Sequence, residues 1–158
     1  MKKVISFLLV CFLSLSLASC GNNVTLSEEE QQAYDCAVEM KSMMKDPDSF
    51  KLYDSMYMLQ IYDKEGELRV TYTVFKYGGT NSYGAVVTDE AVFKDGKYLM
   101  DYADEADPKA DNYEDQLYFK IDINHYETFK ALGKPSPLYD YNLLELDVEK
   151  IKSKMGLE

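Results

Sequence analysis

The residue types that most often carry out acid–base or nucleophilic chemistry are scarce in this chain. His125 is the only histidine, so every Ser-His-Asp or Cys-His arrangement would have to use it. No Gly-x-Ser-x-Gly sequence is present to place a serine nucleophile at a strand-to-helix turn. The pattern places His125 in the first turn of a short helix, a common surface position, and we predict no catalytic role for it.

Cys36 is a second candidate for covalent chemistry. It falls in the middle of a predicted helix, beside the apolar face of that helix and far from the N-terminus that would lower the pKa of a thiol. Because free cysteines in such positions behave as small hydrophobic residues, we expect Cys36 to be buried and unreactive.

Acidic side chains gather between positions 101 and 115. They are Asp101, Asp104, Glu105, Asp107, Asp111, Glu114 and Asp115. Calcium prefers six to eight oxygen ligands, but the spacing here does not fit an EF-hand and lacks its glycine. A solvated acidic loop is the simplest interpretation. Two hypotheses stay open for this segment: a calcium-stabilised module, and a hydrolase that works through paired carboxylates.

Other cofactor sites have little support. The chain contains no Cys-x-x-Cys and no His-Glu-x-x-His, the spacings typical of zinc. The glycine-rich segment 78–84 has neither Gly-x-Gly-x-x-Gly nor a Gly-Lys-Ser/Thr ending, so it is not a phosphate-binding loop. We therefore predict no cofactor. Asn81 and Tyr83, at the tip of this predicted loop, are the best candidates for contact with a ligand.

The first twenty residues have the layout of a secretory signal. Two lysines precede an apolar run of 15 residues from Val4 to Ala18. A membrane-spanning helix needs about 20 apolar residues, which favours a cleaved signal over a permanent span. The run ends at Leu17-Ala18-Ser19-Cys20, which resembles the lipobox of bacterial lipoproteins.

That resemblance implies that the chain divides into three parts. Residues 1–19 would be removed as a signal peptide, residues 20–26 would form a lipid-anchored tether, and residues 27–158 would form a single folded domain. Cys20 would carry a thioether-linked diacylglycerol, often with a further acyl chain on its amino group. The partner implied is the lipid bilayer, at the extracytoplasmic face of the cell membrane. Several acyl chains together anchor a protein stably.

The charge balance limits the partners further. The chain has a formal net charge of −11 at pH 7. Loss of residues 1–19, which carry two lysines and no acid, would change this charge to −13. Nucleic-acid binding needs lysine and arginine to neutralise phosphates, and anionic lipid surfaces attract basic segments. Both are disfavoured. Cys36 would be the only thiol left, so no disulfide within the domain is expected.

Patterns along residues 27–102 predict one helix followed by strands. Ser27 and Glu30 form a capping box at the start of a helix, which Pro47 ends at or before Asp46. Residues 50–62 have apolar residues at both odd and even positions, which indicates a central strand or one with a bulge. Strands are also expected at 68–75, 85–93 and 97–102, with a loop over 77–84 and a hairpin turn at Asp95-Gly96.

The last third has weaker signals. Residues 117–123 alternate as a strand does, and Asn124 with Glu127 forms a second capping box for a short helix that ends near Gly133. A short strand is expected at 141–146. Asp147 then caps a final helix, where Leu146 and Ile151 match a hydrophobic staple.

Residues 35–93 resemble small bacterial secreted α+β domains. In those domains a helix ends at a Pro-x-Ser turn, strands follow, and an Asn-Ser-aromatic-Gly loop enters the next strand. Pro47-Asp48-Ser49-Phe50 and Asn81-Ser82-Tyr83-Gly84 correspond to these features. The resemblance implies a fold and carries no activity.

These observations predict an α+β fold in which an N-terminal helix packs on an antiparallel sheet of about four to six strands, with short C-terminal helices. They favour a non-enzymatic lipoprotein that binds an envelope protein, peptide or glycan, or serves as an accessory subunit. The carboxylate-based hydrolase and the calcium-stabilised module are the alternatives.

Overall fold

The computed structural model describes residues 24–80 and 83–157. The predicted signal peptide, the lipid site Cys20 and the candidate ligand contact Asn81 lie outside the described residues. The elements, in chain order, are α1 (Glu28–Met43), the 3₁₀ helix η1 (Pro47–Ser49), β1 (Lys51–Tyr62), β2 (Leu68–Thr80), β3 (Val86–Lys94), β4 (Lys97–Asp101), α2 (Tyr113–Leu132), β5 (Asp140–Glu145) and α3 (Val148–Met155).

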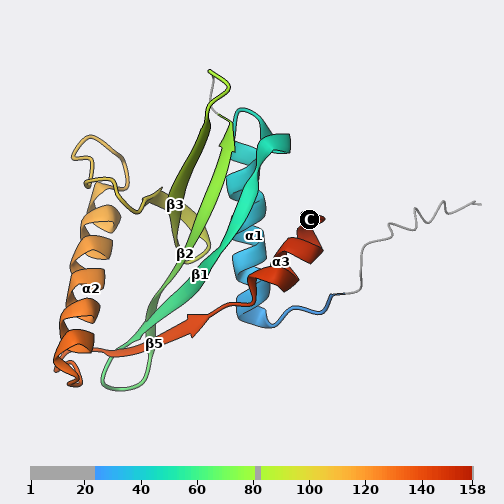
Figure 1. Cartoon of the computed structure of the whole chain (residues 1–158). Helices are drawn as coiled ribbons and strands as arrows, with labels where there is room; N and C mark the ends of the chain where they lie inside the picture. Colours follow the sequence, from blue (N-terminus) through green and yellow to red (C-terminus); the bar gives the residue numbers. More distant parts are fainter. Residues whose placement is uncertain (1–23, 81–82, 158) are drawn as a thin grey trace, which may run out of the picture.

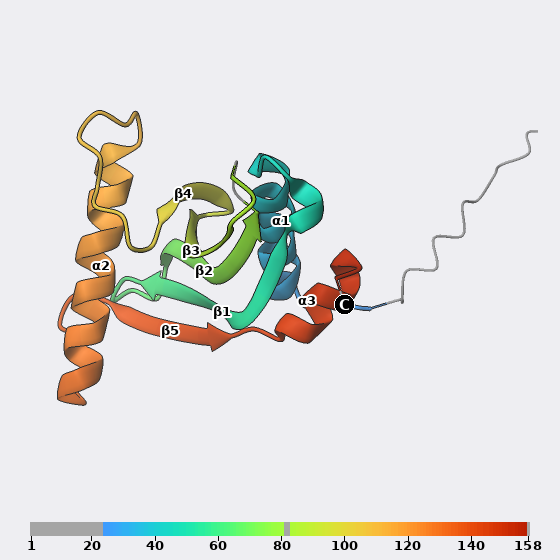
Figure 2. The same cartoon turned by 45° about the horizontal axis from the view of Figure 1, so that its top comes forward.

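The five strands form one antiparallel sheet in the order β4-β3-β2-β1-β5. The helices cover both of its faces: α1 and α3 lie on one side and α2 on the other (Figures 1 and 2). This arrangement confirms the predicted α+β class. It also explains why β1 has apolar residues of both parities, since a strand in a sheet covered on two faces is buried on both.

The core beneath α1 and α3 follows directly from the sequence. Ser27 accepts a hydrogen bond from the Glu30 backbone and Glu30 accepts one from the Ser27 backbone, so the predicted capping box is present. The buried stripe of α1 packs against β1, β2, β3 and α3. Its buried members include Ala33, Cys36, Ala37 and Met40 of α1, Phe75 and Phe93 of the sheet, and Ile151 of α3. The Asp147 cap of α3 is confirmed as well.

The prediction of a strand at 117–123 was wrong. The helix predicted to end near Gly133 is present, but it begins at Tyr113 and not at Asn124. A single helix of 20 residues, α2, runs through both segments and ends at Gly133 in the left-handed conformation. Apolar residues at 117, 119, 121 and 123 mimic strand alternation. In the helix, however, Phe119 and Ile123 face the sheet, while Leu117 and Ile121 are 41% and 53% exposed. A two-residue period and a helical face coincided over this short stretch.

The loop predicted over 77–84 was also wrong in its first half, because β2 continues to Thr80. Gly78 and Gly79, within β2, allow close packing and do not form a turn. A Cβ atom on Gly79 would lie 1.9 Å from the terminal methyl of Met44, and one on Gly78 would lie 2.8 Å from the Tyr53 ring. The Asp95-Gly96 turn, in contrast, has φ angles of 48° and 80°, as the hairpin prediction requires.

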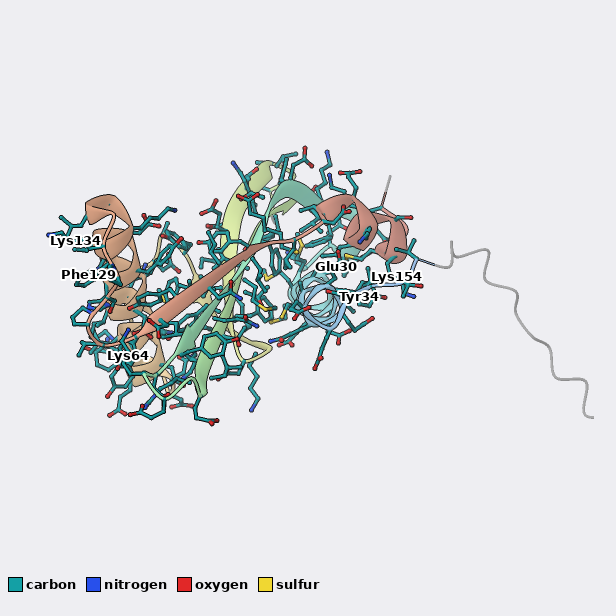
Figure 3. The ribbon with its side chains drawn as sticks, turned by 90° about the horizontal axis from the view of Figure 1, so that it is seen from below. Glu30, Tyr34, Lys64, Phe129, Lys134 and Lys154 are labelled. Carbon is teal, nitrogen blue, oxygen red and sulfur yellow. The ribbon has the colours of Figure 1, made fainter. Side chains whose placement is uncertain are left out.

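The described chain enters the fold beside α3. Figure 3 shows Glu30, Tyr34 and Lys154 at this end of the molecule, and Lys64, Phe129 and Lys134 at the opposite end. We call these the entry end and the distal end. Within residues 24–80 and 83–157, no helix combines the length and apolar character needed to cross a membrane.

Candidate functional site

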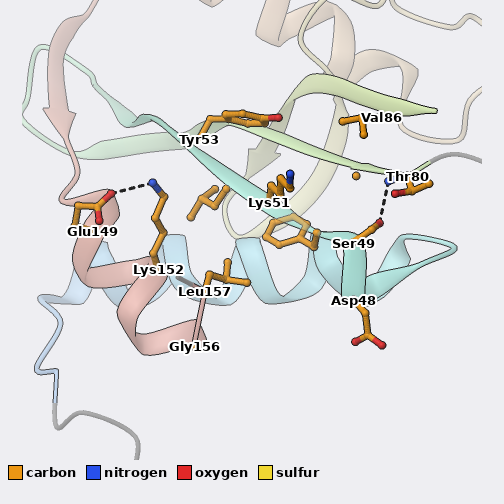
Figure 4. Close-up of a pocket in the computed structure, with 13 residues that line it drawn as sticks. Asp48, Ser49, Lys51, Tyr53, Thr80, Val86, Glu149, Lys152, Gly156 and Leu157 are labelled. Atoms are coloured by element: carbon orange, nitrogen blue, oxygen red, sulfur yellow. Dashed lines mark hydrogen bonds and ion pairs between the residues drawn. The ribbon is translucent and has the colours of Figure 1, made fainter. Parts of the chain in front are cut away.

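A cleft of about 630 Å³ lies at the α3 side of the sheet (Figure 4). We call it the β1–α3 cleft. It runs from the end of α3, past the first residues of β1, to the last residues of β2 and the first residue of β3. Its lining consists of Asp48, Ser49, Phe50, Lys51, Leu52, Tyr53, Gly79, Thr80, Val86, Glu149, Lys152, Gly156 and Leu157.

Local hydrogen bonds hold the two ends of the β1–α3 cleft. At one end the Ser49 hydroxyl accepts a hydrogen bond from the backbone N–H of Thr80, at 2.8 Å. At the other end Lys152 Nζ lies 2.8 Å from Glu149 and 2.5 Å from Asp54 of β1 (Figure 4 shows the Glu149 contact). These contacts tie η1 to β2 and α3 to β1. The cleft is therefore bounded by elements that are fixed to the sheet.

The floor of the cleft combines apolar surface with main chain. Phe50 and Leu52 line it but are only 4% and 5% exposed, and Gly79 contributes no side chain. Charged groups at the rim have both signs, with Asp48 and Glu149 as acids and Lys51 and Lys152 as bases. Such a surface suits recognition by shape, backbone hydrogen bonds and a few charges. It offers no close set of acid, base and nucleophile.

The predicted site residues that the structure describes lie outside the β1–α3 cleft. Tyr83 is described and is 95% exposed, but it does not line the β1–α3 cleft. The acidic segment lies elsewhere too. Five of its seven acids are exposed, whereas Asp101 and Asp115 are half-buried. Asp115 Oδ1 lies 2.5 Å from Lys94 Nζ.

Asp101 is the most enclosed part of that segment. It accepts a hydrogen bond from the Tyr77 hydroxyl at 3.2 Å. Burial raises the pKa of its carboxyl, as does the nearby charge of Asp89. Across residues 24–80 and 83–157, no group of three or more histidine, cysteine, aspartate or glutamate side chains is arranged to hold a metal ion. The calcium hypothesis thus gains no support from this part of the chain.

A second cavity, of about 350 Å³, lies between the sheet and α2. Asp95 and Asp122 both line it, together with Arg69 and Lys94. Asp122 accepts a hydrogen bond from the Tyr72 hydroxyl at 2.9 Å. Burial raises the pKa of Asp122, and this hydrogen bond partly opposes the increase. Sequence patterns did not single out either carboxylate.

His125 is half-buried within α2 and not in a first helical turn, so its predicted location was wrong. Its Nδ1 lies 2.5 Å from the Tyr141 hydroxyl, and its ring packs against Phe129, with centroids 4.8 Å apart. The contact with Tyr141 links α2 to β5.

Cys36 is 1% exposed. Burial raises the pKa of its thiol to about 12, which confirms the predicted burial and keeps the sulfur protonated at neutral pH.

Sequence reasoning missed the residues of the β1–α3 cleft. Lys51, Tyr53, Lys152 and Leu157 are ordinary surface types that lie about a hundred positions apart, in two segments. The mixed parity of residues 50–62 indicated a central strand or one with a bulge. The structure has both features, since β1 lies inside the sheet and its register with β2 shifts between Leu52 and Met56.

No family model, no curated protein and no solved structure matches this chain. The similarity of Leu17-Ala18-Ser19-Cys20 to a lipobox and that of residues 35–93 to secreted domains stay predictions.

Proposed function

We propose that this protein is a lipoprotein anchored through Cys20 to the extracytoplasmic face of the cell membrane. Its domain would be a non-enzymatic binding or accessory module, and the β1–α3 cleft would hold the ligand. The observation that carries the binding proposal is the cleft itself: its volume of about 630 Å³ falls in the range of roughly 300–1,000 Å³ that is typical of ligand sites.

The position of the cleft is consistent with an anchor. Lys154 of α3 lies 3.5 Å, through Nζ, from the backbone oxygen of Val24, at the start of the described chain. The helix that forms one wall of the cleft is therefore next to the point where the tether enters (Figure 3). A tether over residues 20–26 spans on the order of 20 Å when extended. A ligand in the cleft would be close to the bilayer.

The anchor is tested by fractionation and intact mass. We expect the native protein to sediment with membranes and to carry two or three acyl chains on Cys20, because one chain alone binds reversibly. The Cys20→Ser variant, exported by the same signal, should be soluble. An unmodified Cys20 thiol in the membrane-associated native protein would refute the anchor.

The binding site is tested by photo-crosslinking in cells that produce the protein. A photoreactive amino acid replaces Lys51, in the cleft, and in a matched variant replaces Lys97, an exposed residue of the β3–β4 hairpin. We expect a discrete adduct only from position 51, with its chemical class identified by mass spectrometry. No adduct, or equal adducts from both positions, would contradict a site in the cleft.

One observation favours a second candidate, the carboxylate-based hydrolase. Asp95 and Asp122 share the second cavity, and burial raises the pKa of one of them, as in enzymes where one carboxyl acts as an acid. A panel of chromogenic glycosides tests this candidate. Hydrolysis that is lost in Asp122→Asn and kept in Asp104→Asn would support the enzyme over the binding module.

A further inference from the structure

The first half of β1 has a sheet neighbour on only one side. β5 pairs with Tyr57–Tyr62, and its last contact is a 3.2 Å hydrogen bond from the Leu146 N–H to the Met56 carbonyl. The chain then turns into α3. Within the described residues, no strand occupies the position beside residues 51–55 that would continue β5.

A bulge interrupts the pairing of this half of β1 with β2. Lys51 and Leu52 are in register with β2, and the register resumes only at Met56 opposite Phe75. Three residues of β1, Tyr53, Asp54 and Ser55, therefore stand opposite the single β2 residue Lys76. In the part of the chain described, these three have no registered partner in either neighbouring strand. Among the described residues, no strand covers the side of residues 51–55 that faces away from β2, and this side can pair with an added strand.

The β1–α3 cleft lies along this edge. Lys51, Leu52 and Tyr53 line it from β1, and Lys152, Gly156 and Leu157 line it from the opposite wall (Figure 4). A groove between a strand edge and a helix is the geometry in which extended peptides bind by adding a strand to a sheet. Main-chain hydrogen bonds then supply affinity, and alternate side chains meet the two walls.

We propose that the ligand of this cleft is an extended, basic segment of a partner polypeptide, which adds to the sheet beside residues 51–55. This inference rests on the proposed binding function and names its ligand class. Alternate side chains of the added strand would contact the apolar wall around Leu157. Those between them, which carry the positive charge, would lie within reach of the rim carboxylates Asp54 and Glu149.

Charge selects a basic segment over an acidic one. Asp54 and Glu149 are 85% and 77% exposed at the rim, while Lys152 already pairs with both of them. Asp48 adds a third carboxylate, so three acids stand against the two lysines Lys51 and Lys152. The whole chain carries a net charge of −11, so long-range attraction also favours cationic segments.

The test uses the mature lipidated protein in detergent micelles and four synthetic peptides with blocked ends. The first is a seven-residue peptide of alternating valine and lysine. The second replaces lysine with glutamate. The third keeps the basic sequence but carries N-methyl groups on alternate amides, which cannot donate hydrogen bonds. The fourth carries them on the other alternate amides. Binding is followed by backbone amide NMR shifts and by hydrogen exchange.

We expect the basic peptide to shift and protect the amides of Tyr53, Asp54 and Ser55, and to bind at least tenfold more tightly than the acidic peptide. An added strand pairs through alternate amides, so one N-methylated peptide should bind at least tenfold more weakly than the parent. Asp54→Lys should also weaken binding, whereas Glu65→Lys, in the β1–β2 turn at the distal end, should not. Undisturbed amides at 53–55, or equal binding of the parent and both N-methylated peptides, would overturn strand addition.

The two proposals fail separately. If the adduct formed at position 51 in cells is a glycan or another non-polypeptide ligand, the peptide inference is refuted and the binding function stands. If position 51 gives no adduct and the peptide panel causes no shifts at 53–55, both are refuted. In the latter case the bulge and α3 only blunt the sheet edge against aggregation, as natural edges often require.

Discussion

On one face of the sheet, α1 and α3 pack mainly through apolar side chains, whereas on the other face α2 is held by few apolar residues and many polar contacts. The α1 side buries Ala33, Cys36, Ala37 and Met40 along a single helix. The longer helix α2 buries only Gln116, Phe119 and Ile123. The same sheet is therefore covered by two helices that depend on different interactions.

The polar contacts of α2 reach several neighbouring segments. Side chains at its N-terminal end, Asn112 and Gln116, both donate to the Leu99 carbonyl, and Lys120 donates to the Tyr102 carbonyl at 2.6 Å. Tyr72–Asp122 and His125–Tyr141 join its middle to the sheet. Because each hydrogen bond adds only about 0.5–1.5 kcal/mol net but is costly when one partner is lost, we expect the two faces to respond differently to mutation.

The largest expected effect concerns the thiol on the α1 side. A pKa raised from 9.0 to about 12 lowers the thiolate fraction of Cys36 at pH 8 by about a thousandfold. Both measurements use a Cys20→Ser background. The control variant carries Cys36→Ala and Ser42→Cys, which places its single thiol at an exposed site on the same helix. A maleimide should label native Cys36 more slowly than this control thiol by at least the same factor. Comparable rates would show that α1 is not tightly packed.

The second-largest expected effect is a difference in stability between variants of the cores on the two faces of the sheet. Phe93 is fully buried on the α1 side, and its ring centroid lies 5.6 Å from those of Phe75 and Tyr98. Phe93→Ala should lower the free energy of unfolding by about 3–5 kcal/mol in urea denaturation. Phe119 of α2 is equally buried. Phe119→Ala should lower the free energy of unfolding by at least about 1 kcal/mol less than Phe93→Ala does, because a helix held by flexible polar contacts can move into the space. Equal losses would remove the distinction between the faces.

The Tyr72–Asp122 hydrogen bond tests the polar side. Tyr72→Phe leaves a half-buried carboxylate without its donor and should lower the free energy of unfolding by roughly 1–2 kcal/mol at pH 7. The hydrogen bond lowers the pKa of Asp122, so its contribution is present when the carboxyl is charged and declines as the pH falls through that pKa. A loss that is unchanged at pH 3 would contradict this role.

Asp122→Asn should stabilise the protein at pH 7, in contrast to Tyr72→Phe. Burial raises the pKa of Asp122 above its ordinary value, so the charged carboxylate opposes folding above that range and is neutral in both states below it. Asparagine keeps an acceptor for Tyr72 and removes the charge. We expect a small gain in melting temperature at pH 7 that shrinks as the pH falls towards the ordinary aspartate pKa of about 4 and is absent below it. A lower melting temperature at pH 7 would show that Asp122 is held by its cationic neighbours.

The smallest effect concerns the cap of α1. Ser27→Ala removes the acceptor for the Glu30 backbone N–H and should cost about 1 kcal/mol in urea denaturation. Ser42→Ala, at an exposed position on the same helix, should change stability by less than about 0.5 kcal/mol. If the two variants are equally stable, the capping box has no role in this protein.

The elements on the two faces of the sheet also differ in how well the sequence predicted them. The helix α1 was predicted because its cap and its apolar stripe are both local and agree with each other. The sheet was predicted because turns such as Asp95-Gly96 force antiparallel pairing. The first half of α2 was missed because only Phe119 and Ile123 mark its apolar face, and a strand pattern fits the same residues.

The candidate site was beyond prediction for a different reason. Its walls come from residues 48–53, 79–86 and 149–157, and no local pattern relates these segments. The parity of residues 50–62 predicted a central strand or one with a bulge, whereas the edge without a partner depends on where β5 stops.

Local chemistry in the chain determined the start of each well-capped helix, the hairpin turn at Asp95-Gly96, the burial of Cys36 and the antiparallel class of the sheet. These features depend on residues within a few positions of one another, where backbone geometry is fixed by sterics and short hydrogen bonds. Tertiary structure alone decided that α2 is one helix, that Tyr72 meets Asp122, and that β5 leaves residues 51–55 uncovered. Each of these depends on contacts between distant segments, whose free energy appears only once the chain has folded.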